Sequence, residues 1–225
     1  MNIDFDTYFF DCDGVILDSN KIKSEGFFKI ALNYTDDEGA RQFLEYHKSN
    51  GGISRQEKFK YFQSGILEKP YSEGLQRELV NLYGTWCQNE LLDAPVTEGF
   101  YEFIESVKPS SRKFVVSGGS ENELHELFQK RNLSRYFEQI RGNPTSKDDI
   151  MRELFENNSH FGKNCFIGDS IYDYQCSKKY VNEFIFIYKY SECRTYDNFF
   201  KGLPKVTLEK TFTTLLRKAA HLPKI

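Results

Sequence analysis

The chain has few cysteines, and their spacing fits neither a disulfide framework nor a zinc site. An odd number of them occurs in the 225 residues, and no two are spaced as C-x-x-C. We therefore expect reduced thiols and a cytoplasmic location. The five cysteines are Cys12, Cys87, Cys165, Cys176 and Cys193.

Long hydrophobic runs are also missing. No apolar stretch approaches the length that a transmembrane helix needs, so a membrane partner is not expected. The N-terminal segment MNIDFDTYFF has no basic region and contains two acidic residues. This pattern argues against a signal peptide.

Neither sign of charge dominates. Lys and Arg number 30 against 33 Asp and Glu, a formal net charge of −3. The sequence thus lacks the basic excess expected of a nucleic-acid-binding protein. A hydrophobic content of 39% with 16% aromatic residues is enough for a packed core. The length suits one α/β domain, or a core domain that carries a smaller inserted one.

Short apolar runs typical of buried parallel strands alternate with amphipathic helical patterns. Four runs predict strands: Tyr8–Asp11, Phe114–Ser117, Cys165–Gly168 and Glu183–Tyr188. Three helices are predicted over Thr97–Val107, Ser120–Arg131 and Ser146–Asn157, and Ser120 with Glu123 forms a possible capping box. After Lys201 there is a weak strand signal at Val206-Thr207 and a weak basic helix. The alternation predicts an α/β fold with a doubly wound parallel sheet.

The stretch from Ser19 to Asp93 has helical patterns and almost no strand patterns. A helical block after the first strand of a parallel sheet is typical of an inserted cap domain. We therefore predict a catalytic core made of residues 1–18 and 96–225, with an all-helical cap domain over residues 19–95.

Two aspartates follow the first apolar run, with one residue between them. The alternation of a strand end places Asp11 and Asp13 on the same side, so their carboxylates can converge. Two such charges are unfavourable together unless a cation or a shared proton compensates them. The simplest use of the pair is Mg²⁺ binding with nucleophilic catalysis.

Three further motifs follow later strands or begin helices. In VVSGGS, Ser117 and the backbone of Gly118 could hold phosphate oxygens, although this segment could also be a plain strand–helix turn. Lys147 falls in the first turn of a predicted helix, where a cation is disfavoured unless it meets an anion. Alternatively, it could be a solvated surface lysine that pairs with Asp148 or Asp149. In FIGDSIYDYQ, Asp169 and Asp173 can face one hard cation. Because parallel strands end on one edge of a sheet, these motifs should meet in space.

In this order, the four motifs resemble those of the haloacid dehalogenase-like hydrolase superfamily, over most of residues 6–190. The resemblance implies a Rossmann-like core with a helical cap, and Asp11 as the nucleophile that forms an aspartyl-phosphate. Asp13 would be the general acid and base, with a pKa nearer neutrality than that of an exposed aspartate. Ser117 and Gly118 would bind phosphoryl oxygens, and Lys147 would neutralise charge.

The same resemblance implies a Mg²⁺ cofactor. The carboxylate of Asp11, the backbone carbonyl of Asp13 and the carboxylate of Asp169 would be ligands. Asp173 would complete the metal site by orienting a metal-bound water or its neighbours. An aspartate at the position of Asp13 is kept by phosphatases and phosphomutases of this superfamily and missing from its dehalogenases.

The favoured function is a phosphatase for a small phosphorylated metabolite, such as a sugar phosphate or a phosphoglycolate-like acid. A β-phosphoglucomutase-like phosphomutase and a non-catalytic phosphate-binding protein are the alternatives. Lys23 lies where the mutases carry a histidine, which weakens the mutase interpretation. In the cap, the segment N-G-G-I-S-R makes Arg55 a candidate substrate-binding residue, or else a solvated residue of a helix that Ser54 caps. The sequence does not predict the oligomeric state.

Overall fold

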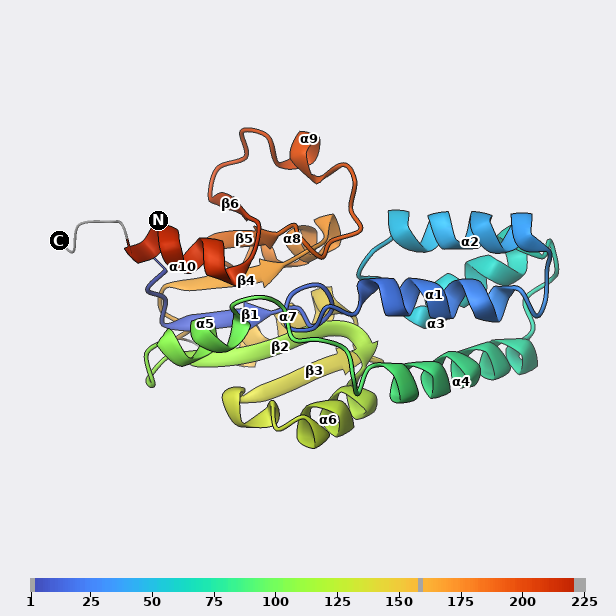
Figure 1. The fold of residues 1–225 in the computed structure, drawn as a ribbon, viewed down its shortest axis with the longest axis horizontal. Coiled ribbons are helices and arrows are strands. Elements are labelled where there is room, and N and C mark those ends of the chain that lie inside the picture. Colours follow the sequence, from blue (N-terminus) through green and yellow to red (C-terminus); the bar gives the residue numbers. More distant parts are fainter. Residues whose placement is uncertain (1–2, 158–159, 221–225) are drawn as a thin grey trace.

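A six-stranded parallel sheet forms the centre of the computed structural model, which describes residues 3–157 and 160–220. The strand order is β3-β2-β1-β4-β5-β6 (Figure 1). The sheet confirms the predicted fold class. The structure does not describe residues 1–2, 158–159 and 221–225. All of them belong to the predicted core, and the first two also belong to the N-terminal segment MNIDFDTYFF. The strands are β1 (Thr7–Phe10), β2 (Arg112–Ser120), β3 (Gln139–Asn143), β4 (Asn164–Gly168), β5 (Glu183–Ile187) and β6 (Val206–Glu209).

The four strands predicted from apolar runs are β1, β2, β4 and β5, and the weak signal at Val206-Thr207 is β6. The sequence analysis missed β3, whose residues QIRGN include only one large apolar side chain, Ile140. This strand pairs with β2 alone and lies at the edge of the sheet, so it needs no continuous apolar run. Strand β2 continues to Ser120, three residues beyond its predicted end.

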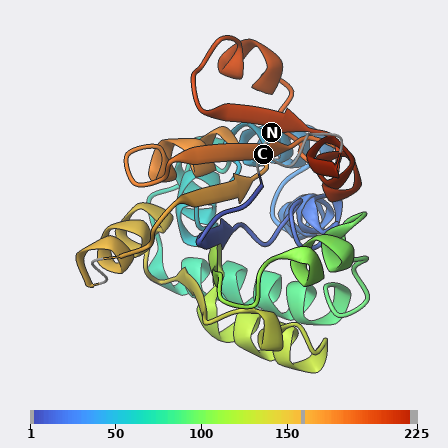
Figure 2. The ribbon, with the colours of Figure 1, turned by 90° about the vertical axis from the view of Figure 1, so that its left-hand side faces the viewer.

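Helices cover both faces of the sheet, as Figure 2 shows in a view along it. Adjacent residues of β1 point to opposite faces. Phe10 packs against Phe100, Phe103 and Phe212, whereas Phe9 packs against Phe114 and Phe161. The helices of the core are α5 (Phe100–Ser106), α6 (Glu121–Lys130), α7 (Lys147–Asn157), α8 (Ile171–Ser177), α9 (Tyr196–Phe200) and α10 (Phe212–Ala220), with a 3₁₀ turn, η2 (Ser134–Tyr136).

The predicted capping box at the start of α6 is wrong. Ser120 is the N-cap residue, but its side chain accepts no capping hydrogen bond. The carboxylate of Glu123 instead accepts two hydrogen bonds from Arg55. A bidentate hydrogen bond from a charged guanidinium is stronger than one from a neutral backbone amide. The carboxylate of Glu123 therefore binds Arg55 and does not cap the start of α6.

Between β1 and α5 the chain forms a helical insertion (residues 20–90), at the right of Figure 1. It contains the predicted helices, and its described residues include no strand. Phe27 packs against Phe43, Phe59 and Tyr83, which gives the insertion an aromatic centre of its own. Its elements are α1 (Asn20–Ala31), α2 (Asp37–Ser49), α3 (Arg55–Tyr61), the π-helical turn η1 (Phe62–Ile66) and α4 (Glu73–Glu90).

The two connections between the insertion and the rest of the chain lie side by side. Leu17 and Val96 form an antiparallel bridge. The amide of Asp18 donates to the carbonyl of Pro95 at 2.8 Å, and that of Thr97 donates to the carbonyl of Ile16 at 3.0 Å. The predicted domain boundaries, after residues 18 and 95, fall at this junction and stay a prediction.

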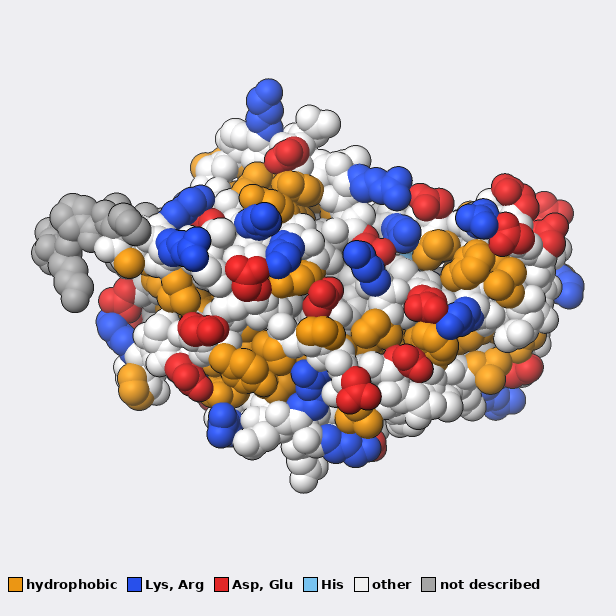
Figure 3. Space-filling model, viewed as in Figure 1, with side chains coloured by type: hydrophobic (Ala, Val, Ile, Leu, Met, Phe, Trp, Pro, Cys, Tyr) orange, Lys and Arg blue, Asp and Glu red, His pale blue; other side chains and the backbone are white. Residues whose placement is uncertain are grey.

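Basic and acidic side chains are interspersed over the face seen in Figure 3. This distribution agrees with the near-neutral composition. In the part of the chain that the structure describes, no helix is both long enough and apolar enough to cross a membrane.

Candidate active site

Asp11 and Asp169 lie next to each other at the point where the strand order reverses. Each follows the last residue of its strand, β1 or β4, and these strands are parallel neighbours. The amide of Asp11 donates to the carbonyl of Ile167 at 2.9 Å, which fixes the start of the loop. Ligands of open α/β sheets bind at this switch point, outside the carboxyl ends of the strands.

Lys147 brings a buried positive charge to this point. It is the first residue of α7, and only 1% of its side chain is exposed. Its Nζ lies 2.7 Å from Oδ1 of Asp11 and 2.5 Å from Oδ1 of Asp173. The expectation that this lysine meets an anion is therefore confirmed, and it is not a surface residue.

Asp173 has both carboxylate oxygens engaged. Oδ1 accepts from Lys147, and Oδ2 accepts from the amide and hydroxyl of Ser170 at 3.0 and 2.7 Å. With Ser170 it forms a capping box at the start of α8. This geometry holds Asp173 as a partner of Lys147 and makes it less available to a ligand than Asp11 or Asp169.

Three buried carboxylates, those of Asp11, Asp169 and Asp173, have oxygens within 4.8 Å of one another. Burial raises the pKa of Asp11 to about 7 and that of Asp169 well above its ordinary value, and the neighbouring carboxylates add to both effects. Oδ1 of Asp11 is buried, and its close contact is the ammonium of Lys147 at 2.7 Å. Such a cluster of buried carboxylate oxygens fits a hard divalent cation such as Mg²⁺.

Asp13 lies beside the insertion. Its carboxylate accepts a hydrogen bond from Ser19 at 2.5 Å and forms an ion pair with Lys23 of α1. Burial alone would raise the pKa of Asp13, but Lys23 and Ser19 outweigh it and hold this pKa below its ordinary value. The expected pKa near neutrality is therefore not found in this arrangement, because the sequence analysis did not anticipate the ion pair with Lys23.

The two residues predicted to bind phosphate occupy different positions. Ser117 is fully buried, and its Oγ accepts a hydrogen bond from the amide of Gly119 at 3.1 Å, so it does not reach the cavity wall. Gly118 does line the cavity. A Cβ atom there would lie 2.4 Å from the carbonyl oxygen of Gly52, so only glycine permits this approach of the insertion to the end of β2.

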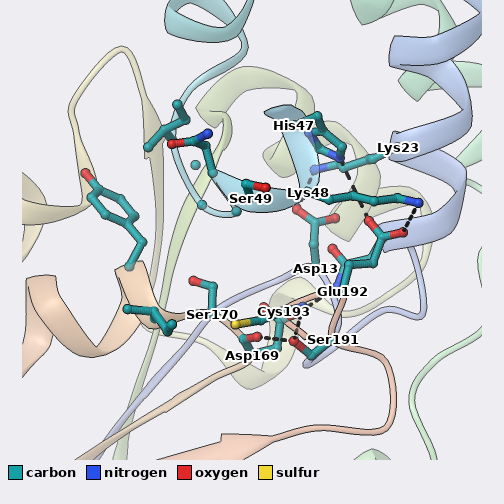
Figure 4. A pocket seen from close by; sticks show the side chains of 18 of the residues that line it. Asp13, Lys23, His47, Lys48, Ser49, Asp169, Ser170, Ser191, Glu192 and Cys193 are labelled. Carbon is teal, nitrogen blue, oxygen red and sulfur yellow. Dashed lines mark hydrogen bonds and ion pairs between the residues drawn. The ribbon is translucent and has the colours of Figure 1, made fainter. Parts of the chain in front are cut away.

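A cavity of about 470 Å³ lies between the core and the insertion. This volume is within the usual range for small-molecule sites. Asp11, Asp13, Lys147 and Asp169 line it together with Gly118 and Arg55, so six of the predicted site residues meet at one cavity. Figure 4 shows the two walls facing each other, with His47, Lys48 and Ser49 from the insertion opposite Asp169, Ser170 and Ser191 from the core.

Arg55 also lines the cavity, but its guanidinium is engaged. It donates to both carboxylate oxygens of Glu123, at 2.9 and 2.5 Å, and stands over the ring of Tyr83. The structure thus places this candidate substrate-binding residue in a bidentate bridge between the insertion and α6 of the core.

The arrangement at the sheet edge agrees with a comparison of the sequence with protein families. The model for haloacid dehalogenase-like hydrolases matches residues 8–187, which is most of the chain. The chain belongs to this family. The match includes the predicted site residues, from Asp11 to Asp173, and confirms the resemblance seen in the four motifs.

Solved structures show the same fold. A predicted phosphatase from Clostridium acetobutylicum is 18% identical, with a TM-score of 0.72 over 97% of this chain and 100% of that one. CbbY from Rhodobacter sphaeroides in complex with phosphate is 15% identical, with a TM-score of 0.73 over 94% and 96%. CbbY bound to xylulose-(1,5)-bisphosphate gives 16% identity and a TM-score of 0.72 over the same shares. No curated protein sequence matches the chain significantly.

Three residues at the cavity were missed by the sequence analysis. Asn20 donates to Asp169 at 2.6 Å, Lys58 contacts His47, and Glu192 reaches the insertion from the loop after β5. Asn20 and Glu192 do not belong to any of the recognised sequence motifs, so no sequence signal pointed to them. Lys58 could have been found, because it shares a helical stripe with Arg55 and Phe59 on a face that is otherwise buried.

Proposed function

We propose that the chain is a Mg²⁺-dependent phosphatase that hydrolyses a small phosphorylated metabolite through an aspartyl-phosphate on Asp11. The observation that carries this proposal is the contact of Asp11 with the buried Lys147 at the switch point, beside Asp169. A buried carboxylate at a strand end, with a fixed cation beside it, is arranged to attack phosphorus.

In the proposed reaction, a carboxylate oxygen of Asp11 forms a bond to phosphorus as the ester P–O bond breaks. Asp13 donates a proton to the leaving oxygen and later takes one from the water that hydrolyses the acyl phosphate. That water releases inorganic phosphate and restores Asp11. Because Lys23 keeps Asp13 ionised, substrate binding must first weaken this ion pair before Asp13 can act as an acid.

The residues that would hold Mg²⁺ are Asp11 and Asp169 through their carboxylates and Asp13 through its backbone carbonyl. Asp173 would orient neighbours of the metal. When bound, the metal would neutralise charge on the phosphate and on the surrounding carboxylates.

The size of the cavity and its position between the core and the insertion support a small substrate rather than a folded protein or a nucleic acid. CbbY, with the same fold, binds phosphate and a bisphosphate sugar. The helical insertion would act as the cap that closes over the substrate and excludes bulk water. Cytoplasmic location and the absence of nucleic-acid and membrane partners stay predictions.

The test of this function is phosphate release from a panel of phosphorylated metabolites in Mg²⁺ or in EDTA. Release that EDTA abolishes is the expected result. If no phosphate appears but an isomerised product does, the phosphomutase alternative replaces the proposal. If ligands bind but none is converted, the chain is a binding protein.

We expect Asp13→Asn to lower the rate on alkyl phosphates by about 10²–10⁴-fold, because their leaving oxygen needs a proton. On p-nitrophenyl phosphate, whose leaving group needs no acid, the loss should be below about 10-fold. The measurement is kcat/KM on both substrates, because this ratio reports formation of the aspartyl-phosphate and not its hydrolysis, in which Asp13 acts as the base with either substrate. Equal losses on the two would remove Asp13 from the acid role.

Mg²⁺ should stabilise the protein more at pH 8 than at pH 5. The folded pKa of Asp11, about 7, lies above its ordinary value of 3.8, so the folded metal-free protein holds the extra proton between these values. Its stability therefore falls as the pH rises towards 7, and at pH 5 that proton must leave before metal binds. The same Mg²⁺ concentration is used at both pH values, at about ten times the Kd measured at pH 8. We then expect Tm to rise by roughly 3–6 °C at pH 8 and by at most about 1 °C at pH 5.

The control for this measurement is Asp169→Asn, which should remove most of the Mg²⁺ effect at both pH values. A rise in Tm that is the same at pH 5 and pH 8 would contradict the assignment of the metal to these carboxylates.

A further inference from the structure

Lys58 is a buried lysine in the wall of the cavity. It belongs to α3 of the insertion, and only 4% of the residue is exposed. Its Nζ lies 2.7 Å from Nδ1 of His47 and 5.3 Å from the centre of the Phe27 ring. Burial lowers the pKa of Lys58 to about 7, with the nearby positive charge of Lys23 as the next cause.

Lys58 differs from the other buried lysine and arginine side chains of the described chain, which are those of Lys147 and Arg55. Arg55 pairs with Glu123, and Lys147 pairs with Asp11. Within the described residues, no carboxylate forms an ion pair with Lys58. The carboxylates of Asp13 and Glu192 act on Lys58 only at longer range and are themselves paired with other lysines. A buried lysine without an ion-pair partner of its own is costly, so the fold alone gives no reason to keep it.

The less buried cations around Lys58 do have partners. Lys23 pairs with Asp13, and Lys48 lies 3.9 Å from Glu192. Figure 4 shows Lys48 and His47 directed towards Glu192. The carboxylate of Glu192 also accepts a hydrogen bond from Ser24. Glu192 is the acidic residue that the core contributes to this wall, and its carboxylate is thus already engaged by residues other than Lys58.

His47 sets the direction in which Lys58 can donate. Burial lowers the pKa of His47 well below its usual value, so the imidazole is neutral. When Lys58 is charged, Nδ1 accepts from it and the ring proton is on Nε2. One of the three ammonium protons is then used, and the others remain for a ligand in the cavity.

We infer that Lys58, held by His47, binds a second anionic group of the substrate, so that the substrate is a phosphate ester that also carries a carboxylate or another phosphate. The inference rests on the proposed phosphatase function. The reacting phosphate would lie at Asp11 and Lys147, on the core wall. The second anion would lie on the insertion wall of the same cavity, where it supplies a direct ion-pair partner for Lys58.

The test uses pairs of phosphate esters that share a carbon skeleton and differ in the second anion. Phosphoglycolate is compared with 2-hydroxyethyl phosphate, and fructose 1,6-bisphosphate with fructose 1-phosphate. We expect kcat/KM to be at least about 10-fold higher for the doubly anionic member of one pair, since a hydrogen bond to a charged group contributes this much. The pair that shows the preference tells whether the second anion is a carboxylate or a phosphate.

Lys58→Met should lower this preference ratio by about 10- to 100-fold. The matched control is Lys60→Met, because Lys60 is an exposed lysine on the same helix. Its ratio should stay within about two-fold of wild type, as expected for a solvated side chain. Lys58→Gln repeats the test with a polar side chain, and circular dichroism verifies that each variant is folded.

The inference and the proposed function fail in different ways. Phosphate release with equal kcat/KM within both pairs, or a preference that Lys58→Met leaves intact, would overturn the inference and leave the phosphatase standing. If no ester is hydrolysed, including p-nitrophenyl phosphate, the phosphatase fails. Calorimetric binding of phosphoglycolate and 2-hydroxyethyl phosphate to Asp11→Asn, with and without Lys58→Met, then decides the inference alone: a Lys58-dependent preference supports it, and equal binding overturns it.

Discussion

Asp11→Asn should abolish Mg²⁺-dependent phosphate release, with a fall in kcat of about 10⁴-fold or more. The amide cannot form the acyl phosphate and is a poorer metal ligand than the carboxylate. The change is nearly isosteric, and Lys147 keeps its contact with Asp173, so the fold should survive. The measurement is single-substrate phosphate release at saturating Mg²⁺.

Asp18→Asn is a suitable control, because Asp18 is an aspartate of the same loop that does not line the cavity. Its kcat should stay within about two-fold of wild type, as for a surface substitution away from the site. A rate for Asp11→Asn within about 10-fold of wild type would show that another group is the nucleophile.

Lys147→Met should have the largest effect on stability. It leaves Asp11 and Asp173 buried without the cation that lies within 2.7 Å of both. Removing one partner from a buried ionic cluster costs about 3–5 kcal/mol, because the remaining charges are no longer compensated. We expect the free energy of unfolding, measured by denaturant titration in EDTA, to fall by this amount.

The matched control is Arg152→Met on the same helix. Arg152 is half exposed and pairs with Asp149 at 2.6 Å on the surface of α7. Surface ion pairs contribute about 0–1 kcal/mol, so this variant should remain close to wild type. Similar losses in the two variants would mean that Lys147 acts only as a helix residue.

The edge of the sheet where Asp11 and Asp169 meet was predictable from the sequence, because each of these residues directly follows a strong apolar strand signal. Asp11 and Asp169 each follow an apolar run, and parallel strands end together. The position of Lys147 also followed from an electrostatic argument, since a cation at a helix N-terminus needs an anion.

What the sequence could not predict depends on how the insertion sits on the core. The pairs Lys23–Asp13 and Arg55–Glu123 join residues from different parts of the molecule, and no periodicity or motif encodes such contacts. They changed the expected pKa of Asp13 and engaged the guanidinium of Arg55. Strand β3 was missed for a simpler reason, since an edge strand with one large apolar residue lacks the pattern of a buried one.

The junction of the insertion has a consequence for how such a chain can diversify. Because Leu17 and Val96 are paired and Asp18 is hydrogen-bonded to Pro95, the insertion leaves and re-enters the core at one place. A segment whose ends are already adjacent can be lengthened, shortened or exchanged at a small cost in loop entropy. The strands that present Asp11 and Asp169 would keep their register through such an exchange. The junction therefore makes this insertion a unit that could be exchanged between related proteins without disturbing the strands of the sheet.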